Sequence, residues 1–229
     1  MESSAKPASV AVCRDGTLLG QYFQNSGLTH SRTLMAMMES LLKNLEVSIS
    51  EIDLVAVARG PGSFTGVRIG VSAAKGLAWG ASLPVCGVST LEAMAYQTPE
   101  TGMIVCPVMD ARRSQVYNAL FEWRDNSAPS RLSEDRAISL DELATGLKTQ
   151  NKPILLLGDG AEMCFDFLSA AGLSCRLAPG LMRYQTAYGV ALASANNGSI
   201  PAAELEPSYL RPSQAERARI TRNSEFGIT

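Results

Sequence analysis

Hydrophobic residues recur along this chain at two periods, one typical of helices and one typical of strands. Leu34, Met38 and Leu41 follow helical spacing. Short apolar runs flank Asp15-Gly16, a dipeptide that favours a hairpin turn. In the first half the pattern predicts, in chain order, strands at 9–13 and 17–22, a helix at 31–45, a strand at 53–58, a helix at 65–79, a strand at 84–88 and a helix at 90–97.

The pattern breaks at residues 98–102, and a second series of elements follows. It predicts strands at 103–109 and 115–123, a polar surface loop at 124–136, a helix at 140–147, a strand at 154–157, a helix at 161–171, a strand at 174–177 and a helix at 184–196. Each half thus predicts a hairpin followed by alternating helices and strands. We expect an α/β fold with two ribonuclease-H-like lobes. The predicted domains are residues 1–99, residues 100–206 and a C-terminal helix or tail at 207–229.

The charge of the chain argues against tight nucleic-acid binding by this protein alone. The 229 residues carry a formal net charge of −2, and basic residues are scattered apart from Arg112-Arg113 and the C-terminal tail. That tail holds Glu216 and Glu225 beside its arginines, which favours a solvated helix over a binding arm. Proteins that grip RNA directly normally present a basic face.

The numbers of histidines and cysteines and the lengths of the apolar runs exclude some kinds of site and some cellular locations. His30 is the single histidine, so a His-x-x-x-His metal site is not available, and we expect His30 to cap or orient the helix that follows. The five cysteines form no Cys-x-x-Cys pair, which favours free buried thiols in a reducing cytoplasm. No apolar run approaches the ~20 residues that span a bilayer, and no signal-peptide pattern is present. We therefore expect a cytoplasmic protein without membrane contact.

The most distinctive segment is the glycine-rich stretch at residues 58–70, between a predicted strand and a predicted helix. Ser63 or Thr65 is placed to cap the helix, so that its amide groups, together with Arg68, would attract an anion. The stretch lacks the spacing of the known nucleotide-binding loops, and we favour a tight turn that lets the helix pack closely. The residues of this signature loop are Gly60, Gly62, Ser63, Thr65, Gly66 and Arg68.

Residues 59–70, Arg-Gly-Pro-Gly-Ser-Phe-Thr-Gly-Val-Arg-Ile-Gly, closely resemble the signature of the TsaB (YeaZ) family. Further segments are similar to that family across nearly the whole chain: His30-Ser31 at the start of a helix, residues 108–117, Gly158-Asp159-Gly160-Ala161 and residues 207–211. TsaB is the dimerisation subunit of the bacterial machinery that makes threonylcarbamoyladenosine at position 37 of tRNA.

This resemblance implies the fold of the actin, sugar-kinase and Hsp70 (ASKHA) superfamily and a role without catalysis. In the family the paralogue TsaD holds the metal and transfers the threonylcarbamoyl group to tRNAs that decode ANN codons. TsaB binds TsaD, a small ATPase named TsaE joins them, and tRNA is reached only through the complex. We accordingly expect no catalytic residue, no metal and no cofactor in this chain.

The amino-terminal residues depart from the family pattern. Family members begin with an apolar strand that ends in a triplet similar to Glu2-Ser3-Ser4, but here only Met1 precedes the triplet. That strand is central in the family's sheet, so its lack would leave unpaired backbone groups on both neighbouring strands.

The family also implies a partner-binding face. Its first two long helices pair with equivalent helices of TsaD, or with a second TsaB when TsaD is absent. The helices at 31–45 and 65–79 are apolar on more than one side, and the second is rich in small residues. Burial within the chain's own core is the alternative. The predicted partner-binding residues are Leu34, Met38, Leu41, Ile69, Ala73 and Trp79.

Two enzymatic alternatives differ from the scaffold role. A glycopeptidase-like hydrolase needs a metal site or an activated nucleophile, and Ser63 does not lie in a Gly-x-Ser-x-Gly elbow. An ATP-binding kinase of the same fold would use Glu2-Ser3-Ser4, Asp110 and Gly158-Asp159-Gly160, which also read as ordinary turns. Protection of the chain from heat by ATP with magnesium would distinguish a kinase from a scaffold.

Overall fold

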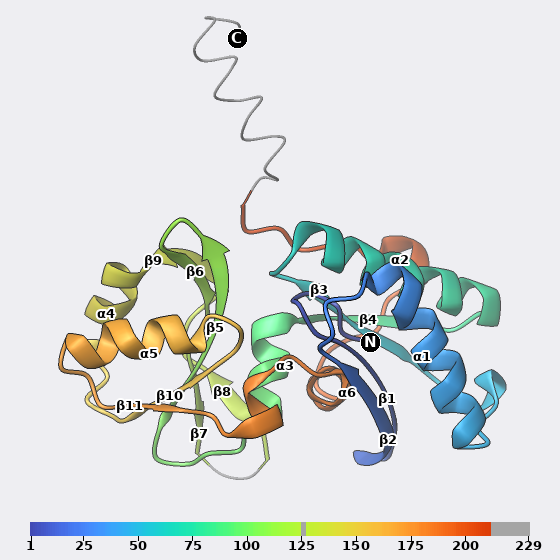
Figure 1. The fold of residues 1–229 in the computed structure, drawn as a ribbon. Helices are drawn as coiled ribbons and strands as arrows, with labels where there is room; N and C mark the ends of the chain where they lie inside the picture. The colour runs from blue at the N-terminus through green and yellow to red at the C-terminus, as the bar shows by residue number, and fades with distance from the viewer. Residues whose placement is uncertain (125–126, 212–229) are drawn as a thin grey trace, which may run out of the picture.

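The computed structural model describes residues 1–124 and 127–211 (Figure 1). Its helices are α1 (His30–Asn44), α2 (Phe64–Ala81), α3 (Thr90–Tyr96), α4 (Leu140–Lys148), α5 (Ala161–Ala170) and α6 (Ala187–Ser194). Its strands are β1 (Ala8–Arg14), β2 (Thr17–Gln24), β3 (Val55–Gly60), β4 (Val85–Ser89), β5 (Ile104–Arg112), β6 (Gln115–Asn118), β7 (Phe121–Trp123), β8 (Pro129–Arg131), β9 (Arg136–Ser139), β10 (Ile154–Leu157) and β11 (Cys175–Leu177). This order confirms the predicted α/β fold.

The first half places a hairpin near a parallel strand pair. β1 and β2 pair antiparallel through a turn at Asp15 and Gly16, whose φ angles are 49° and 76°. β3 and β4 pair in parallel. α1 packs on β1, α2 packs on β3, and the two helices contact each other. Leu34, Val57 and Val71 are buried in the core that these elements share.

The second half is a mixed sheet with helices packed on it. β5, β10 and β11 run parallel, while β6 pairs antiparallel with both β5 and β9. β7 pairs antiparallel with β5 and with β8. α5 packs on β10 and β11, and Ile104, Val108 and Leu156 are buried in the core beneath it.

α3 and α6 lie between the two groups of elements (Figure 1). α6 comes from the range predicted for the second lobe, yet it packs on β1, β3 and α3. Its first turn is held by the Oγ of Ser9, which accepts the N–H of Ala187 at 2.6 Å. α3 in turn packs on β5 as well as on β3 and β4. The halves therefore share helix contacts, and their division at residue 99 stays a prediction.

Several boundaries differ from the predicted ones. The polar stretch at 124–136 contains β8 and the start of β9 rather than a loop alone, because backbone pairing with β7 and β6 orders residues without an apolar pattern. The predicted strand at 115–123 is two strands, β6 and β7. β3 continues through Gly60 into the signature loop. The predicted tail beyond Arg211, with Arg217, Arg219, Arg222, Glu216 and Glu225, lies outside the described residues.

Among the residues described, none of the helices has the length and apolar character that crossing a membrane requires. The five cysteines are free thiols, and Cys86, Cys106 and Cys164 are buried. Burial raises the pKa of the Cys164 thiol to about 12, so it stays protonated and unreactive at neutral pH.

The turn between β5 and β6 is strained and gives a stability prediction. Arg112, Arg113 and Ser114 have φ angles of 67°, 59° and 56°, in the left-handed region that disfavours side chains. Replacing Ser114 by glycine should therefore raise the free energy of unfolding by about 0.5–1 kcal/mol. Ser130→Gly in β8 is the matched control and should lower it. Chemical denaturation of both variants measures this, and a destabilised Ser114→Gly variant would contradict it.

Candidate partner-binding surface and signature loop

The signature loop turns the chain from β3 into α2. Its Gly60–Pro61 peptide bond is cis, and α2 begins at Phe64. Ser63 is the N-cap, since its Oγ accepts the N–H of Gly66 at 3.3 Å. Of the two predicted capping residues, Thr65 lies inside the helix instead.

The glycines of the loop and of α2 face the amino-terminal segment of the chain. A Cβ on Gly62 would overlap the carbonyl oxygen of Ser4, and one on Gly66 would overlap that of Ser3. The N–H of Ser63 donates to the same Ser4 oxygen at 2.6 Å, and the Oγ of Ser3 donates to the carbonyl of Gly66 at 2.9 Å. These contacts support the interpretation that the glycines permit close packing.

Arg68, on the second turn of α2, lies against two aromatic rings. Its guanidinium lies 3.9 Å from the ring centroid of Phe64, and its Nε donates to the hydroxyl of Tyr209 at 2.9 Å. The two rings stack with centroids 4.7 Å apart. The amides of Ser63 and Gly66 already have acceptors. Anion binding by the loop stays a prediction. Fewer of its backbone N–H groups are free to bind an anion than the sequence indicates.

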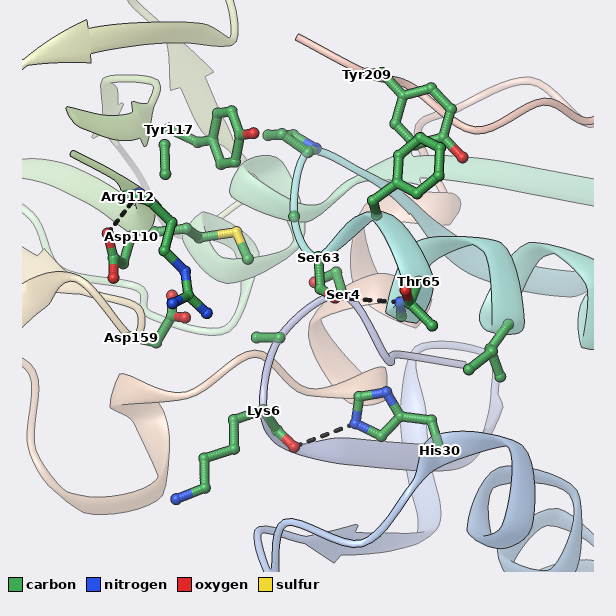
Figure 2. Close-up of a pocket in the computed structure, with 18 of the residues that line it drawn as sticks. Ser4, Lys6, His30, Ser63, Thr65, Asp110, Arg112, Tyr117, Asp159 and Tyr209 are labelled. Atoms are coloured by element: carbon green, nitrogen blue, oxygen red, sulfur yellow. Dashed lines mark hydrogen bonds between the residues drawn. The ribbon is translucent and has the colours of Figure 1, made fainter. Parts of the chain in front are cut away.

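A cleft of about 810 Å³ adjoins the loop and is lined by residues of both halves. Figure 2 shows Ser4, Lys6, Ser63 and Thr65 on one side, and Asp110, Arg112, Tyr117 and Asp159 on the other.

Two carboxylates of the cleft, those of Asp110 and Asp159, are engaged in local structure. Asp110 Oδ1 accepts the N–H of Arg112 at 2.7 Å, which fixes the start of the β5–β6 turn. Desolvation raises the pKa of Asp159, and a hydrogen bond from Gln185 partly offsets this. Gly158 and Gly160 pack against the backbone of β5, where side chains would overlap or crowd it. Within the described part of the chain, no three histidine, cysteine or carboxylate groups are placed to hold a metal ion.

His30 is the first residue of α1, at the rim of this cleft. Its Nε2 donates to the carbonyl oxygen of Lys6 at 3.2 Å (Figure 2). The imidazole thus ties the start of α1 to the segment that follows Ser4, which agrees with the orienting role predicted from the sequence.

Three of the six predicted partner-binding residues lie in the chain's own core. Leu34, Met38 and Leu41 are 1%, 8% and 2% exposed and pack toward β1 and β3. Because their side chains are covered within the chain, the structure corrects the prediction for Met38 and Leu41, which belong to the core. Leu34 is also buried but borders the groove described next, so its partner-binding role stays a prediction. Burial in the core, the alternative left open by the sequence, holds for this side of α1.

The other three predicted residues are on the outer side of α2. Trp79 is 73% exposed, and Ile69 and Ala73 are half-buried. Ile69 and Ala73 border a groove of about 510 Å³ between α1 and α2. We call this groove together with Trp79 the α1–α2 face. The groove is lined by His30, Ser31, Leu34, Met35, Phe64, Thr65, Arg68, Ile69, Ser72 and Ala73.

The sequence prediction missed outward residues of this face. Met35 lies one residue after Leu34, is 42% exposed and lines the groove. Gly76, in the last third of α2, has no described atom outside the nearby helix backbone within 4 Å of the position that a Cβ would take. Glycine weakens a helix interior, and no neighbour among the residues that the structure describes explains its presence here. Met35 and Gly76 are recognised as residues of this face by their solvent exposure in the structure. Helical spacing in the sequence does not show which residues are exposed.

Known proteins are similar to this chain in sequence. A family model described as TsaD, tRNA N6-adenosine threonylcarbamoyltransferase, matches residues 24–218. The tRNA threonylcarbamoyladenosine biosynthesis protein TsaB of Bacillus subtilis is 30% identical over 220 residues, covering 94% of each chain. The protein of the same name from Haemophilus influenzae is 31% identical over 230 residues, covering 92% of each.

Solved structures share the fold. A Pseudomonas aeruginosa protein described as similar to peptidase YEAZ superposes with a TM-score of 0.76 at 25% identity, covering 92% of this chain and 97% of that one. A structure named YeaZ from the same organism gives a TM-score of 0.77 at 23% identity, covering 91% and 97%, and supports the fold alone.

Proposed function

Since this chain belongs to the TsaB (YeaZ) family, we propose that it is the non-catalytic subunit that binds TsaD through the α1–α2 face and so activates threonylcarbamoyl transfer to adenosine 37 of tRNAs decoding ANN codons. Its part in tRNA threonylcarbamoyladenosine biosynthesis follows from the family. The observation that carries the scaffold role is the incompletely covered apolar side of α2, where Trp79 is exposed and Ile69 and Ala73 are half-buried at the groove.

The shape of this surface suits a packed helix. An exposed tryptophan contributes a large apolar area when a partner covers it. Ala73, Ser72 and Gly76 are small and lie along α2, so a partner helix can approach its backbone closely. Met35 adds an adaptable side chain from α1. The chain would then act by binding one conformation of TsaD more tightly than another, which shifts the transferase toward its active state.

The proposed assembly has further members. TsaE would join the complex, and a second copy of this chain would occupy the same face when TsaD is absent. The formal net charge of −2 does not favour tight tRNA binding by this chain alone, so tRNA would be reached through the complex in the cytoplasm.

Gly76→Ala should separate chain stability from partner binding. Alanine favours the helix by up to about 1 kcal/mol, and among the described residues no atom outside the nearby helix backbone lies within 4 Å to oppose the methyl group. We expect a higher melting temperature for the isolated chain and a weaker complex with the TsaD of the same organism. Calorimetric titration of both variants measures this, with Gly146→Ala in α4 as the control that should leave affinity unchanged. Tighter or unchanged binding by Gly76→Ala would place the contact elsewhere.

A further inference from the structure

Arg68 is a solvent-exposed cation whose guanidinium is held by side chains from two distant parts of the chain. The rings of Phe64, one turn earlier on α2, and of Tyr209 have their centroids 3.9 and 5.8 Å from it. The Tyr209 hydroxyl, beside the start of α2 in Figure 2, accepts the Nε hydrogen at 2.9 Å. An exposed arginine normally samples many rotamers, so these contacts orient the guanidinium before a partner arrives.

The charge of Arg68 is not neutralised within residues 1–124 and 127–211. Among these residues neither terminal nitrogen has a hydrogen-bond acceptor, and no carboxylate oxygen lies within 4 Å of the guanidinium. α2 contains no acidic residue, so the pairing that often occurs one helical turn away is not available. Lys75, the other cation of α2, donates instead to the backbone carbonyls of Ala203 and Leu205.

Arg131 shows how a ring-bound guanidinium is completed elsewhere in the same chain. It lies over the ring of Phe121 at 4.7 Å and also pairs with the carboxylates of Asp135 at 2.6 Å and Glu92 at 3.7 Å. Arg68 has the aromatic contacts but lacks the carboxylate. A planar guanidinium matches a carboxylate through two parallel N–H···O bonds, and Arg68 has both terminal nitrogens free to form them.

Arg68 borders the groove of the α1–α2 face. The residues that line this groove include no aspartate and no glutamate. Beside Arg68 the lining is largely apolar, with Leu34, Met35 and Ile69 along the groove. A helix packed there could bring a carboxylate to Arg68 without meeting a like charge on this chain.

We propose that Arg68 pairs through its two terminal nitrogens with a carboxylate on the partner helix that packs in the groove. This inference rests on the proposed function, in which the partner is TsaD, and it adds the side chain that the partner must present: an aspartate or a glutamate. Phe64 and Tyr209 are positioning residues that hold the guanidinium in place. Tyr209 thereby makes the segment that follows α6 part of the binding surface.

Three substitutions test the pair by titration with the TsaD of the same organism at several salt concentrations. Arg68→Gln should weaken binding by about 30-fold at low salt and make the affinity less dependent on salt. Arg68→Lys keeps the charge but loses the planar pairing, and should weaken binding by about 10-fold. Tyr209→Phe keeps the ring and removes the acceptor for Nε, and should weaken it by about 3- to 10-fold.

Arg176→Gln is the matched control for the change of charge. Arg176 lies on β11 in the second half of the chain and pairs with Glu100, outside the α1–α2 face. This variant should bind TsaD with unchanged affinity. Circular dichroism of each free variant checks that it is folded, and the Arg68→Lys and Tyr209→Phe results decide the test if Arg68→Gln does not fold.

A double-mutant cycle identifies the partner's carboxylate. Exposed aspartates and glutamates of TsaD are changed one at a time to their amides and titrated against the original chain and against Arg68→Gln. One amide variant should bind the original chain more weakly, yet bind Arg68→Gln no more weakly than unchanged TsaD does. Coupling at none of these positions would overturn the proposal.

Ala73→Asp, a substitution in the same groove, separates this inference from the proposed function. If Ala73→Asp weakens binding of TsaD but Arg68→Gln does not, the carboxylate pair is overturned and the face stands. If neither weakens binding, the face is not the TsaD-binding surface and both proposals fail. If Arg68→Gln binds TsaD normally but the complex loses affinity for tRNA, the ligand of Arg68 is a phosphate, which also overturns the pair.

Discussion

Replacing Ala73 by aspartate should abolish the complex with TsaD and leave the isolated chain folded. Ala73 is half-buried at the edge of the groove between α1 and α2, so a carboxylate there reaches water in the free chain. In a packed interface the same charge would lose its hydration without a partner, which weakens binding by about 100-fold or more. Titration with the TsaD of the same organism and circular dichroism of the free variant measure both effects.

Two variants separate this effect from general disruption. Met38→Asp places the charge in the core, where Met38 is 8% exposed, and should unfold the chain rather than weaken the complex alone. Ala170→Asp makes the same alanine-to-aspartate change at an exposed position of α5, outside the α1–α2 face, and should leave binding intact. A folded Ala73→Asp variant that binds normally would remove this residue from the interface.

Gly66→Ala should strongly destabilise the chain through the packing of the signature loop. The added Cβ would overlap the carbonyl oxygen of Ser3, a buried backbone atom that has little freedom to move. We expect a loss of about 3 kcal/mol in the free energy of unfolding, which lowers the melting temperature of a chain this size by about 6–12 °C.

The same substitution elsewhere in α2 is its control. Gly76→Ala lies in the same helix, has open space around its Cβ and should stabilise the chain. Opposite changes in the free energy of unfolding for the two variants would distinguish close packing from helix propensity, because propensity favours alanine at both positions. If Gly66→Ala also stabilised the chain, the glycines of the signature loop would owe their presence to something other than packing on Ser3 and Ser4.

The sequence predicts most of the elements but not how they share their cores. Helical and strand periods locate α1, α2 and β5 because each buries one side or is apolar throughout. β8 escapes prediction because Pro129–Arg131 has no apolar alternation and owes its strand form to pairing with β7. Nothing in the local pattern of α6 indicates that it packs on β1, since that contact joins residues far apart in the chain.

The candidate surface shows the same limit. Helical spacing identifies Leu34, Met38 and Leu41 as one apolar stripe, but it does not say whether a sheet of the same chain or a partner covers that stripe. The structure assigns the stripe to the core and leaves Met35 and Trp79 outside. The role of Gly62 and Gly66 also requires the fold, because Ser3 and Ser4 are distant from them in the sequence.

Reconstituted tRNA modification tests the central claim most directly. The chain is co-purified with the TsaD of its own organism, TsaE and the precursor-forming enzyme are added, and threonylcarbamoyladenosine formed on tRNA is measured with and without this chain. The scaffold role predicts a stable complex whose modification activity requires the chain, and no activity of the chain alone. Full modification in its absence, or failure of the chain to bind TsaD, would contradict that role.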